Sequence, residues 1–516
     1  MEIDEILKTK IRKFLRYSSI KMKKLFTFFV LLFFIACKHP FLYQISTRPW
    51  LYELSKKYGR NITKLSEIPT EEFDVLQQNG VDIVWMMGIW KLGEYGLEFD
   101  RNNTYDNVMP DWTIEDVIGS PFAITEYTCN PELGTDDDIL NLRIELNLRG
   151  MKLMLDFVPN HSAHDCPLSY SDIYMYVQAP GGMYDSDRYN SRGIAYGSDV
   201  GHRPWKDVIQ WNYFVRQTVE HMTKNFVNVL KLADAVRCDV AYLVLNDVFE
   251  EAWKSEIIAY NLTKPDEEFW SVAIKAGREV NKNAIILAES YYDEYNKKLI
   301  DLGFDYVYDK PLLDNLLLTT NDVKEFLKNK NSESWDKACH FVENHDEQRI
   351  VFKTGGNIKK AMAAGTIGAT VGGMIFMNHG QWEGKKNKLD VHLRRATYET
   401  DNLEVKNYYK KLNQVLLEPA FRSSNFYYID NITGDKKDDF ISYIKEEGDN
   451  HYLVVVNYSD NQGCANVPIY NVKGYRYCLL HEALSDQEYV KTITEVKNGM
   501  QICLDAWESQ IFQYNY

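Results

Sequence analysis

The stretch ADAVRCDVAY, residues 233–242, decides the fold expected for this chain. It is a short apolar run that ends in charged side chains, and three other stretches share this pattern. They are KLMLDFVPNH (152–161), AIILAES (284–290) and HFVENHD (340–346). Apolar runs of about four to eight residues bounded by polar turns are typical of fully buried parallel strands. A (β/α)8 barrel carries acidic, His and Arg side chains at the ends of such strands, on its catalytic face. The sequence therefore predicts an enzyme built on an α/β barrel.

The remaining chain continues the alternation of strands and helices. Eight barrel strands are predicted, at 81–90, 120–128, 152–158, 233–239, 284–290, 304–309, 339–344 and 374–380. A polar stretch from about 162 to 205 is too long for an ordinary connection after the third strand, so we expect a functional loop insertion there. After residue 418, short alternating runs separated by turns predict an antiparallel β domain. We expect a catalytic barrel over 38–418 and a β-sandwich over 419–516.

Composition excludes several functional classes. The chain has 516 residues and a formal net charge of −15, which argues against binding of nucleic acid because no basic face is evident. Its eight cysteines are irregularly spaced without a CxxC pair, so they indicate neither a disulfide framework nor a zinc site. No nucleotide, flavin or haem motif is present, and we expect no organic cofactor.

The N-terminal region predicts export. Twelve apolar residues, LFTFFVLLFFIA (25–36), follow a basic segment and precede Cys37. Twelve residues are too few to span a bilayer, which takes about 20, but they suit the apolar core of a secretory signal. FIAC (34–37) resembles a lipoprotein cleavage box, so residues 1–37 are interpreted as a leader that leaves a lipid anchor on Cys37 at the periplasmic or cell surface. Residues 1–21 could be a start-site artefact ahead of Met22. The alternatives are an uncleaved hydrophobic anchor or a chance apolar helix, in which case the protein would be cytoplasmic.

Four motifs at the predicted strand ends resemble those of glycoside hydrolase family 13, the α-amylase family. They are DFVPNH (156–161), AVRCD (235–239), AES (288–290) and FVENHD (341–346), in the family's order. The resemblance covers nearly all of the chain after the leader and implies a (β/α)8 barrel with an insertion after strand 3 and a C-terminal β domain.

The resemblance also implies a retaining mechanism on α-glucosidic bonds. It makes Asp239 the nucleophile, Glu289 the general acid and then base, and Asp346 the carboxylate that stabilises the transition state. Two carboxylates with these separate tasks are what glycoside hydrolysis needs. Six further side chains are expected to contact or brace the sugar: Asp156, His161, Arg237, His345, Phe122 and Arg349.

Departures from the family leave the substrate and the reaction open. Endo-acting amylases usually carry Lys and His three and four residues after the nucleophile, where this chain has Tyr242 and Leu243. We therefore favour small α-glucosides or maltooligosaccharides over starch. The alternatives are a transglycosylase or isomerase (trehalose-synthase-like or sucrose-acting), and a non-catalytic amylase-like binding subunit.

No metal site is predicted. Several amylases hold calcium between the barrel and the third-strand loop through an Asn at the position of Asn160. Calcium takes about six to eight oxygen ligands, and the loop sequence offers no set that can be matched to them. Calcium binding is therefore left open, and no calcium site is assigned.

Overall fold

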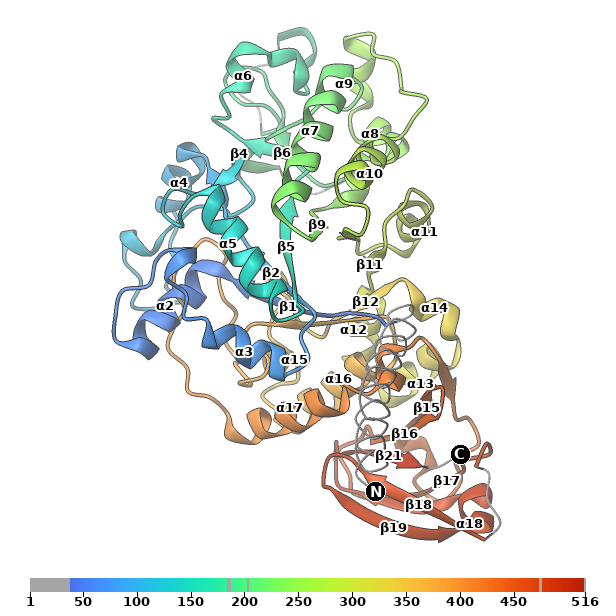
Figure 1. The fold of residues 1–516 in the computed structure, drawn as a ribbon. Helices are drawn as coiled ribbons and strands as arrows, with labels where there is room; N and C mark the ends of the chain where they lie inside the picture. Colours follow the sequence, from blue (N-terminus) through green and yellow to red (C-terminus); the bar gives the residue numbers. More distant parts are fainter. Residues whose placement is uncertain (1–37, 183–186, 202–203, 473–475, 515–516) are drawn as a thin grey trace, which may run out of the picture. The chain divides into compact units, whose positions relative to one another are not determined.

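The computed structural model describes residues 38–182, 187–201, 204–472 and 476–514. Eight parallel strands close into a barrel in which the first strand pairs with the last (Figure 1). These strands are β1 (Phe41–Ser46), β2 (Ile83–Met87), β5 (Lys152–Phe157), β9 (Ala235–Cys238), β10 (Ile285–Ala288), β11 (Tyr306–Tyr308), β12 (Ala338–His340) and β13 (Met374–Asn378). The predicted (β/α)8 barrel is confirmed.

One predicted barrel strand is wrong, and one real strand is missing from the prediction. The first barrel strand is β1, FLYQIS, in which all six residues are buried. Residues 120–128 were assigned to the barrel, but β4 (Ile124–Cys129) pairs antiparallel with β3 (Trp90–Leu92) outside it. Burial in β4 is uneven along the strand, with exposed residues between the buried ends, whereas a barrel strand is buried on both faces.

Helices follow most barrel strands and cover the outside of the barrel. They are α2 (Thr47–Tyr58), α3 (Glu71–Gln78), α5 (Asp136–Asn147), α7 (Arg216–Leu232), α10 (Phe269–Val280), α11 (Asp293–Asp301), α12 (Lys310–Leu316), α13 (Thr320–Lys328), α14 (Ser332–Asp336), α16 (Ile358–Thr370) and α17 (Leu403–Val415). The buried residues of α7 recur at helical spacing, with Met222, Phe226 and Val229 on one face. Gly277 lets α10 approach α7 closely, since a Cβ there would lie 2.7 Å from Phe226.

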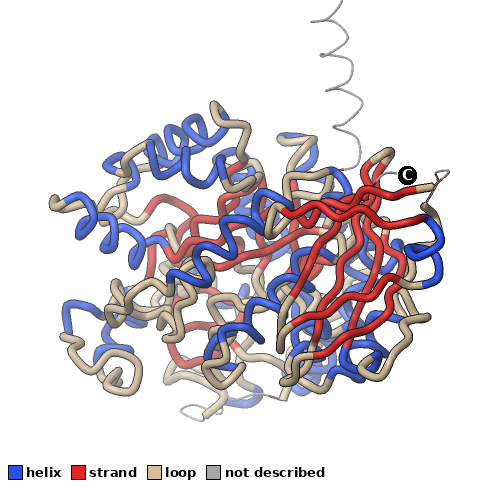
Figure 2. The backbone as a smooth tube through the Cα atoms, turned by 90° about the horizontal axis from the view of Figure 1, so that it is seen from below, coloured by secondary structure: helices blue, strands red, loops and turns tan. Residues whose placement is uncertain are grey.

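Loops at the carboxyl ends of the strands carry the shorter elements. After β5, the insertion forms a three-stranded sheet in the order β6 (His161–Ala163), β8 (Trp205–Gln210), β7 (Tyr196–Gly197). Figure 2 shows the strands of the chain in red and its helices in blue. The short helices are α4 (Glu94–Arg101), α6 (Leu168–Ser171), α8 (Asn246–Ala252), α9 (Lys254–Ala259) and α15 (Ile350–Lys353). The insertion expected after the third strand is present and reaches Gln210.

The C-terminal region is an antiparallel β domain, as predicted. A six-stranded sheet in the order β14-β15-β16-β21-β18-β19 packs against the pair β17-β20, and Leu453, Val467 and Ile502 share the core between them. The elements are β14 (Phe426–Tyr428), β15 (Phe440–Glu447), β16 (Asn450–Asn457), β17 (Gly463–Val467), β18 (Tyr477–Glu482), β19 (Gln487–Thr492), α18 (Ile493–Asn498), β20 (Met500–Leu504) and β21 (Ser509–Tyr514).

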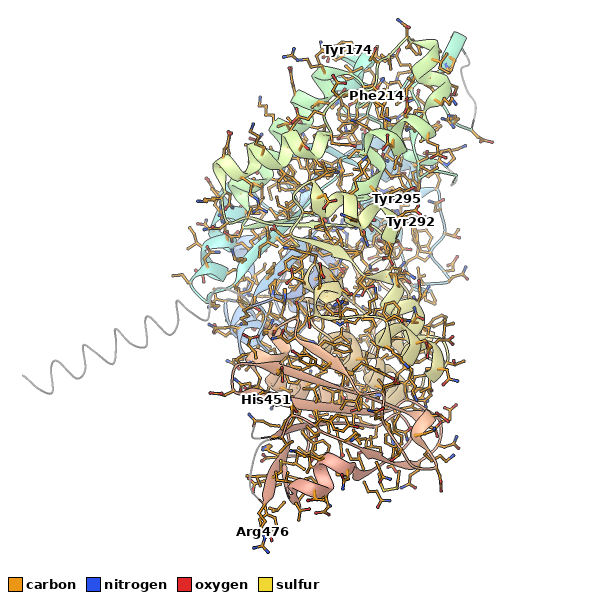
Figure 3. All side chains as sticks on the ribbon, turned by 90° about the vertical axis from the view of Figure 1, so that its right-hand side faces the viewer. Tyr174, Phe214, Tyr292, Tyr295, His451 and Arg476 are labelled. Carbon is orange, nitrogen blue, oxygen red and sulfur yellow. A yellow bond between two sulfur atoms is a disulfide. The ribbon has the colours of Figure 1, made fainter. Side chains whose placement is uncertain are left out.

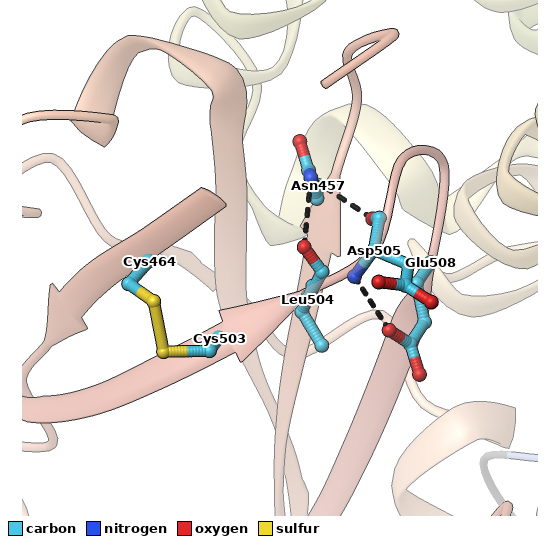
Figure 4. The surroundings of a disulfide bond; sticks show 6 residues. All are labelled: Asn457, Cys464, Cys503, Leu504, Asp505 and Glu508. Carbon is cyan, nitrogen blue, oxygen red and sulfur yellow. Dashed lines mark hydrogen bonds between the residues drawn. A yellow bond between two sulfur atoms is a disulfide. The ribbon is translucent and has the colours of Figure 1, made fainter. Parts of the chain in front are cut away.

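A disulfide joins Cys464 of β17 to Cys503 of β20 (Figure 4). The two cysteines lie opposite each other in the ladder, 39 residues apart in sequence. The irregular cysteine spacing had indicated no disulfide framework, because spacing alone does not reveal which strands become neighbours.

The predicted leader, residues 1–37 with Cys37, lies outside the described residues. Within the described ranges, no helix combines the length and the apolar character needed to cross a membrane.

Candidate active site

Arg237 forms the centre of the site and contacts carboxylates from three barrel strands. Its side chain is fully buried, and Nη1 lies 2.5 Å from Oδ1 of Asp239 while Nη2 lies 2.7 Å from Oε2 of Glu289. Asp156 of β5 is further away, with Oδ1 3.7 Å from Nη1. Residues two apart on a strand point to the same face, which is why Arg237 can reach Asp239. One guanidinium thus holds both predicted reacting carboxylates side by side.

Glu289 has its two oxygens in different surroundings. Oε2 accepts the Arg237 contact and also the backbone N–H of Val240, at 2.7 Å. Val240 is a β-branched residue with φ of 35°, a strained conformation that aims this N–H at the carboxylate. The pKa of Glu289 is raised to about 8, chiefly by burial. The charges of Asp239 and Asp346 add to this increase, and Arg237 offsets part of it. The carboxyl is therefore protonated at neutral pH, and both donors on Oε2 leave Oε1 as the atom that carries the proton.

Asp346 is the open member of the carboxylate set. Its side chain is 48% exposed, and Oδ2 lies 3.1 Å from Nε2 of His345. Burial raises its pKa, but His345, Arg237 and Lys388 outweigh burial and lower it below the ordinary value. Gln44 donates to Nδ1 of His345 at 2.7 Å, so the His345 proton sits on Nε2, the ring nitrogen nearer Asp346. Asp346 is thereby held ionised beside a protonated Glu289.

Asp156 braces the floor of the site. Its carboxylate accepts the indole N–H of Trp85 and the backbone N–H of Gly88, each at 3.1 Å. Burial raises the pKa of Asp156 to about 6, against the opposing effect of Arg237. With these two donors holding Asp156 in place, the Arg237 cluster is preorganised before any ligand binds.

Two more predicted residues lie at the same place. The Phe122 ring is 5.4 Å from the His345 ring and 5.4 Å from the Arg237 guanidinium carbon. His161, at the start of β6, packs its ring 5.4 Å from Trp205, and burial lowers its pKa while Asp239 opposes that shift. Eight of the nine predicted site residues therefore cluster around Arg237, and only Arg349 does not.

Comparisons with known proteins point to one family. The family model described as the α-amylase catalytic domain matches residues 64–173. α-Amylase 3 of Dictyoglomus thermophilum is 24% identical over 310 residues, which are 55% of this chain and 58% of that protein. The chain is therefore similar to α-amylases over the matched regions.

Solved structures of α-amylases share the fold over 92% of this chain. An α-amylase from Lactobacillus plantarum is 19% identical with a TM-score of 0.66, and 98% of its chain is covered. A noncanonic maltogenic α-amylase from Thermotoga neapolitana is 20% identical with a TM-score of 0.67, and 99% of its chain is covered. The sequence match is narrower, because it spans little more than half the length of the curated relative. The matched family region contains DFVPNH but ends before Asp239, Glu289 and Asp346.

Arg349 occupies a different cluster from the candidate carboxylates Asp239, Glu289 and Asp346. Its Nη1 lies 2.7 Å from Oε1 of Glu343 and also donates to the backbone carbonyl of His379. Its Nε donates to the carbonyl of Asn387, so the side chain ties the loop after β13 to the end of β12. The expected contact between Arg349 and substrate stays a prediction.

Three functional residues were missed by sequence reasoning. Gln44 orients His345, Trp85 orients Asp156, and the Lys388 ammonium donates to the backbone carbonyl of Asp346. Gln44 was missed together with its strand β1. Lys388 stands in a lysine-rich loop after the last barrel strand, and only the folded chain shows that this loop reaches Asp346.

The family departure at Tyr242 creates an aromatic cluster next to the acid. Tyr242 stacks on Tyr295 with centroids 5.2 Å apart and meets Tyr292 edge-on, also at 5.2 Å. Tyr292 and Tyr295 lie close together on the face shown in Figure 3, and Tyr292 is 40% exposed. Tyr292 follows Glu289 by three residues, so this aromatic cluster lies close to the candidate acid along the chain.

Proposed function

We propose that this protein is a retaining glycosidase that cleaves α-glucosidic bonds of small α-glucosides or maltooligosaccharides. The observation that carries this proposal is the pair of carboxylates on Arg237. Asp239 contacts Nη1, and Glu289 contacts Nη2 while burial raises its pKa to about 8. A nucleophile held ionised beside an acid held protonated is the division of labour that a retaining glycosidase requires.

In the first half of the reaction, Asp239 attacks the anomeric carbon while Glu289 donates its Oε1 proton to the glycosidic oxygen. The bond from the anomeric carbon to that oxygen breaks, the aglycone leaves as an alcohol, and a glycosyl ester on Asp239 forms. In the second half, Glu289 takes a proton from water as the water oxygen attacks the same carbon. The ester bond breaks, Asp239 is released as a carboxylate, and the product keeps the original anomeric configuration.

The neighbouring side chains have roles that follow from their contacts. Arg237 holds the Asp239 side chain in place through a contact from a guanidinium that stays charged. Asp346 is ionised and exposed, so it can accept hydrogen bonds from sugar hydroxyls as the ring distorts. The positive charge that develops on the sugar ring is stabilised by these carboxylates in a site whose dipoles are already oriented.

Transfer to a second sugar is the alternative within the same mechanism. The exposed ring of Tyr292, backed by Tyr242 and Tyr295, favours it because an aromatic face can pack against a pyranose. Whether water or sugar reaches the glycosyl ester first decides between hydrolase and transglycosylase.

The test is incubation of the purified chain with sucrose, trehalose, maltose, maltooligosaccharides, isomaltose and soluble starch, with products followed by NMR at early times. Initial release of the α-anomer from one of them supports retention and identifies the substrate class. Asp239→Asn should abolish that turnover while leaving the circular dichroism spectrum unchanged. The mechanism is wrong if the β-anomer appears first, or if Asp239→Asn keeps its activity.

We further propose that the protein is exported and held at a membrane through lipid on Cys37. The Cys464–Cys503 bond supports an oxidising compartment, because structural disulfides persist outside the cytoplasm. Cys37→Ser should release the protein from the membrane fraction into the soluble exported fraction. Unchanged membrane association of that variant would count against lipidation.

A further inference from the structure

The turn after the third barrel strand is built around two buried amides. Asn160 ends the DFVPNH motif and is 1% exposed, and Gln210 ends β8 and is fully buried. The backbones of the two segments are paired, because His161 lies opposite Gln210 in the β6–β8 ladder. The turn leads directly into His161, which faces the candidate active site.

Three oxygen atoms converge on the amide nitrogen of Gln210. Nε2 lies 2.8 Å from the backbone carbonyl of Asn160, 2.9 Å from Oδ1 of Asn160 and 3.2 Å from the carbonyl of Trp211. The opposite amide orientation would bring an oxygen against three oxygens, so the nitrogen faces this cluster. Oxygen atoms that converge on one point in this way usually surround a bound cation, and here the amide nitrogen with its partial positive charge lies at that point.

The residues at this point do not fit calcium, which family resemblance places at the Asn160 position. Calcium takes about six to eight oxygen ligands and normally includes carboxylates. Here the three convergent oxygens are neutral, and the Gln210 amide fills the point that they surround. Within the part of the chain that the structure describes, no group of three or more His, Cys, Asp or Glu side chains could hold a metal ion.

We propose that the Gln210 amide replaces the calcium ion and positions His161 without a metal. Asn160 extends the chain of contacts, because its Nδ2 lies 3.3 Å from Nδ1 of His161 and donates to it. The His161 proton then sits on Nε2. Gln210 thus acts through Asn160 as a positioning residue that fixes both the turn and the His161 tautomer.

The first test is thermal unfolding of the full chain in excess EGTA and in millimolar Ca²⁺. The melting temperature should agree within about 1 °C in the two conditions, since a ligand that does not bind the folded state cannot stabilise it. A melting temperature that falls in EGTA and returns with Ca²⁺ overturns the proposal.

The second test is Gln210→Met, which keeps the side-chain length but removes the amide. We expect the melting temperature to fall by roughly 2–5 °C, because the buried hydrogen bonds from the Gln210 amide are lost. We also expect KM to rise about tenfold with a smaller change in kcat, because His161 is expected to bind the sugar in the ground state. Neither change should respond to Ca²⁺.

Asn413→Leu is the matched control for Gln210→Met. Asn413 is another buried amide, 1% exposed, and donates to Oδ1 of Asn79 in the contact between α17 and the end of α3. Its loss should lower the melting temperature while KM stays at the wild-type value. An unchanged KM in Gln210→Met, or an equal rise in Asn413→Leu, overturns the positioning role.

The third test is Gln210→Glu, which brings a carboxylate to the three oxygens. Its melting temperature should fall in EGTA and rise by several degrees in millimolar Ca²⁺, unlike that of the wild type. No response to Ca²⁺ would overturn the inference that the amide occupies a cation position. The KM measurement rests on the proposed function, whereas the unfolding measurements do not. If the protein turned over no glycoside, the melting temperatures would still test whether the Gln210 amide replaces calcium.

Discussion

Arg237 and Lys445 are two fully buried cations in opposite surroundings. Arg237 contacts the carboxylates of Asp239 and Glu289, and its pKa is raised well above the ordinary value because these charges outweigh burial. Lys445, on β15, donates to the backbone carbonyls of Val371 at 3.0 Å and Ser423 at 2.7 Å. Burial lowers the pKa of Lys445 to about 7, and Glu447 opposes this only weakly.

The difference separates a functional charge from a structural one. Removing an ion from water costs several kcal/mol, and only carboxylate partners in good geometry offset that cost. Arg237 has them and stays charged, so its field acts on the reacting groups. Lys445 has only carbonyls, and its role is to join the C-terminal sheet to the segments around Val371 and Ser423, next to the barrel. Two carbonyl acceptors match the two N–H groups of a neutral amine, so Lys445 can lose its proton without breaking these contacts.

The largest expected effect is that of Arg237→Met. The substitution leaves Asp239 and Asp156 buried without their cation and Glu289 without its partner, which should cost about 3–5 kcal/mol of unfolding free energy. The rate should fall about 10²–10³-fold or more, because Asp239 and Glu289 are no longer held in place by the guanidinium. Urea unfolding and initial rates on the substrate found in the NMR panel measure the two effects.

Arg422→Met is the control for this variant. Arg422 is 1% exposed and lies 2.8 Å from Oδ2 of Asp82, away from the reacting carboxylates. Its loss should lower stability by a similar amount while the rate per folded molecule is retained. Equal loss of rate in both variants would mean that Arg237 matters only for folding.

Much of this arrangement could be predicted from the sequence because strand ends carry local signals. Asp239, Glu289 and Asp346 each follow a short apolar run, and in a parallel barrel all carboxyl ends of strands meet at one face. Period-two alternation then places Arg237 beside Asp239. The assignment failed at β1, where FLYQIS is short and lacks charged residues at its end, and at 120–128, where an apolar run belongs to an external ladder.

The contacts that depend on loops could not be predicted. Gln210 and Asn160 are 50 residues apart, and no local pattern shows that the amide of one meets the oxygens of the other. Lys388 and Lys445 resemble ordinary surface lysines until the fold brings backbone carbonyls to their ammonium groups. Tertiary placement, not residue type, makes one of these lysines a neighbour of the active site and the other a buried interface residue.

The second prediction is an alkaline loss of activity set by the acid that Arg237 contacts. Glu289 must be protonated to act, and its pKa is raised to about 8, so kcat should be flat through neutral pH and fall about tenfold per unit above pH 8. A substrate with a nitrophenol leaving group needs less protonation and should show a weaker alkaline decline. An unchanged rate up to pH 10 on a natural glycoside would exclude Glu289 as the acid.

The third prediction concerns the stability of the interface at Lys445. Its pKa is lowered from 10.5 to about 7 on folding, so between these values the unfolded chain binds the extra proton and the folded chain does not. The contribution of this residue to stability therefore rises as pH rises from about 7 to 10.5, by at most about 1.4 kcal/mol per unit. Below pH 7 both states are protonated and the contribution is constant.

Lys445→Met isolates this contribution. The difference in unfolding free energy between wild type and variant, measured in urea at intervals from pH 6 to 9.5, should shift in favour of the wild type as pH rises. A pH-independent difference would show that Lys445 keeps its ordinary pKa, and the contrast with Arg237 would then disappear.

The smallest expected effect comes from Glu447→Gln. Glu447 is the charged neighbour that raises the pKa of Lys445, against the larger effect of burial. Its removal should lower the onset of the Lys445-dependent rise in stability by a few tenths of a pH unit, because partly exposed charges interact weakly in water. The same urea series, run on Glu447→Gln and on Glu447→Gln combined with Lys445→Met, separates this shift from any direct loss of the bond from Asn425 to Glu447. A shift of the onset by a full pH unit or more would mean that Glu447 interacts strongly with Lys445, as the carboxylates interact with Arg237. The contrast between the two buried cations would then be wrong, although the direct contacts of Lys445 are carbonyls.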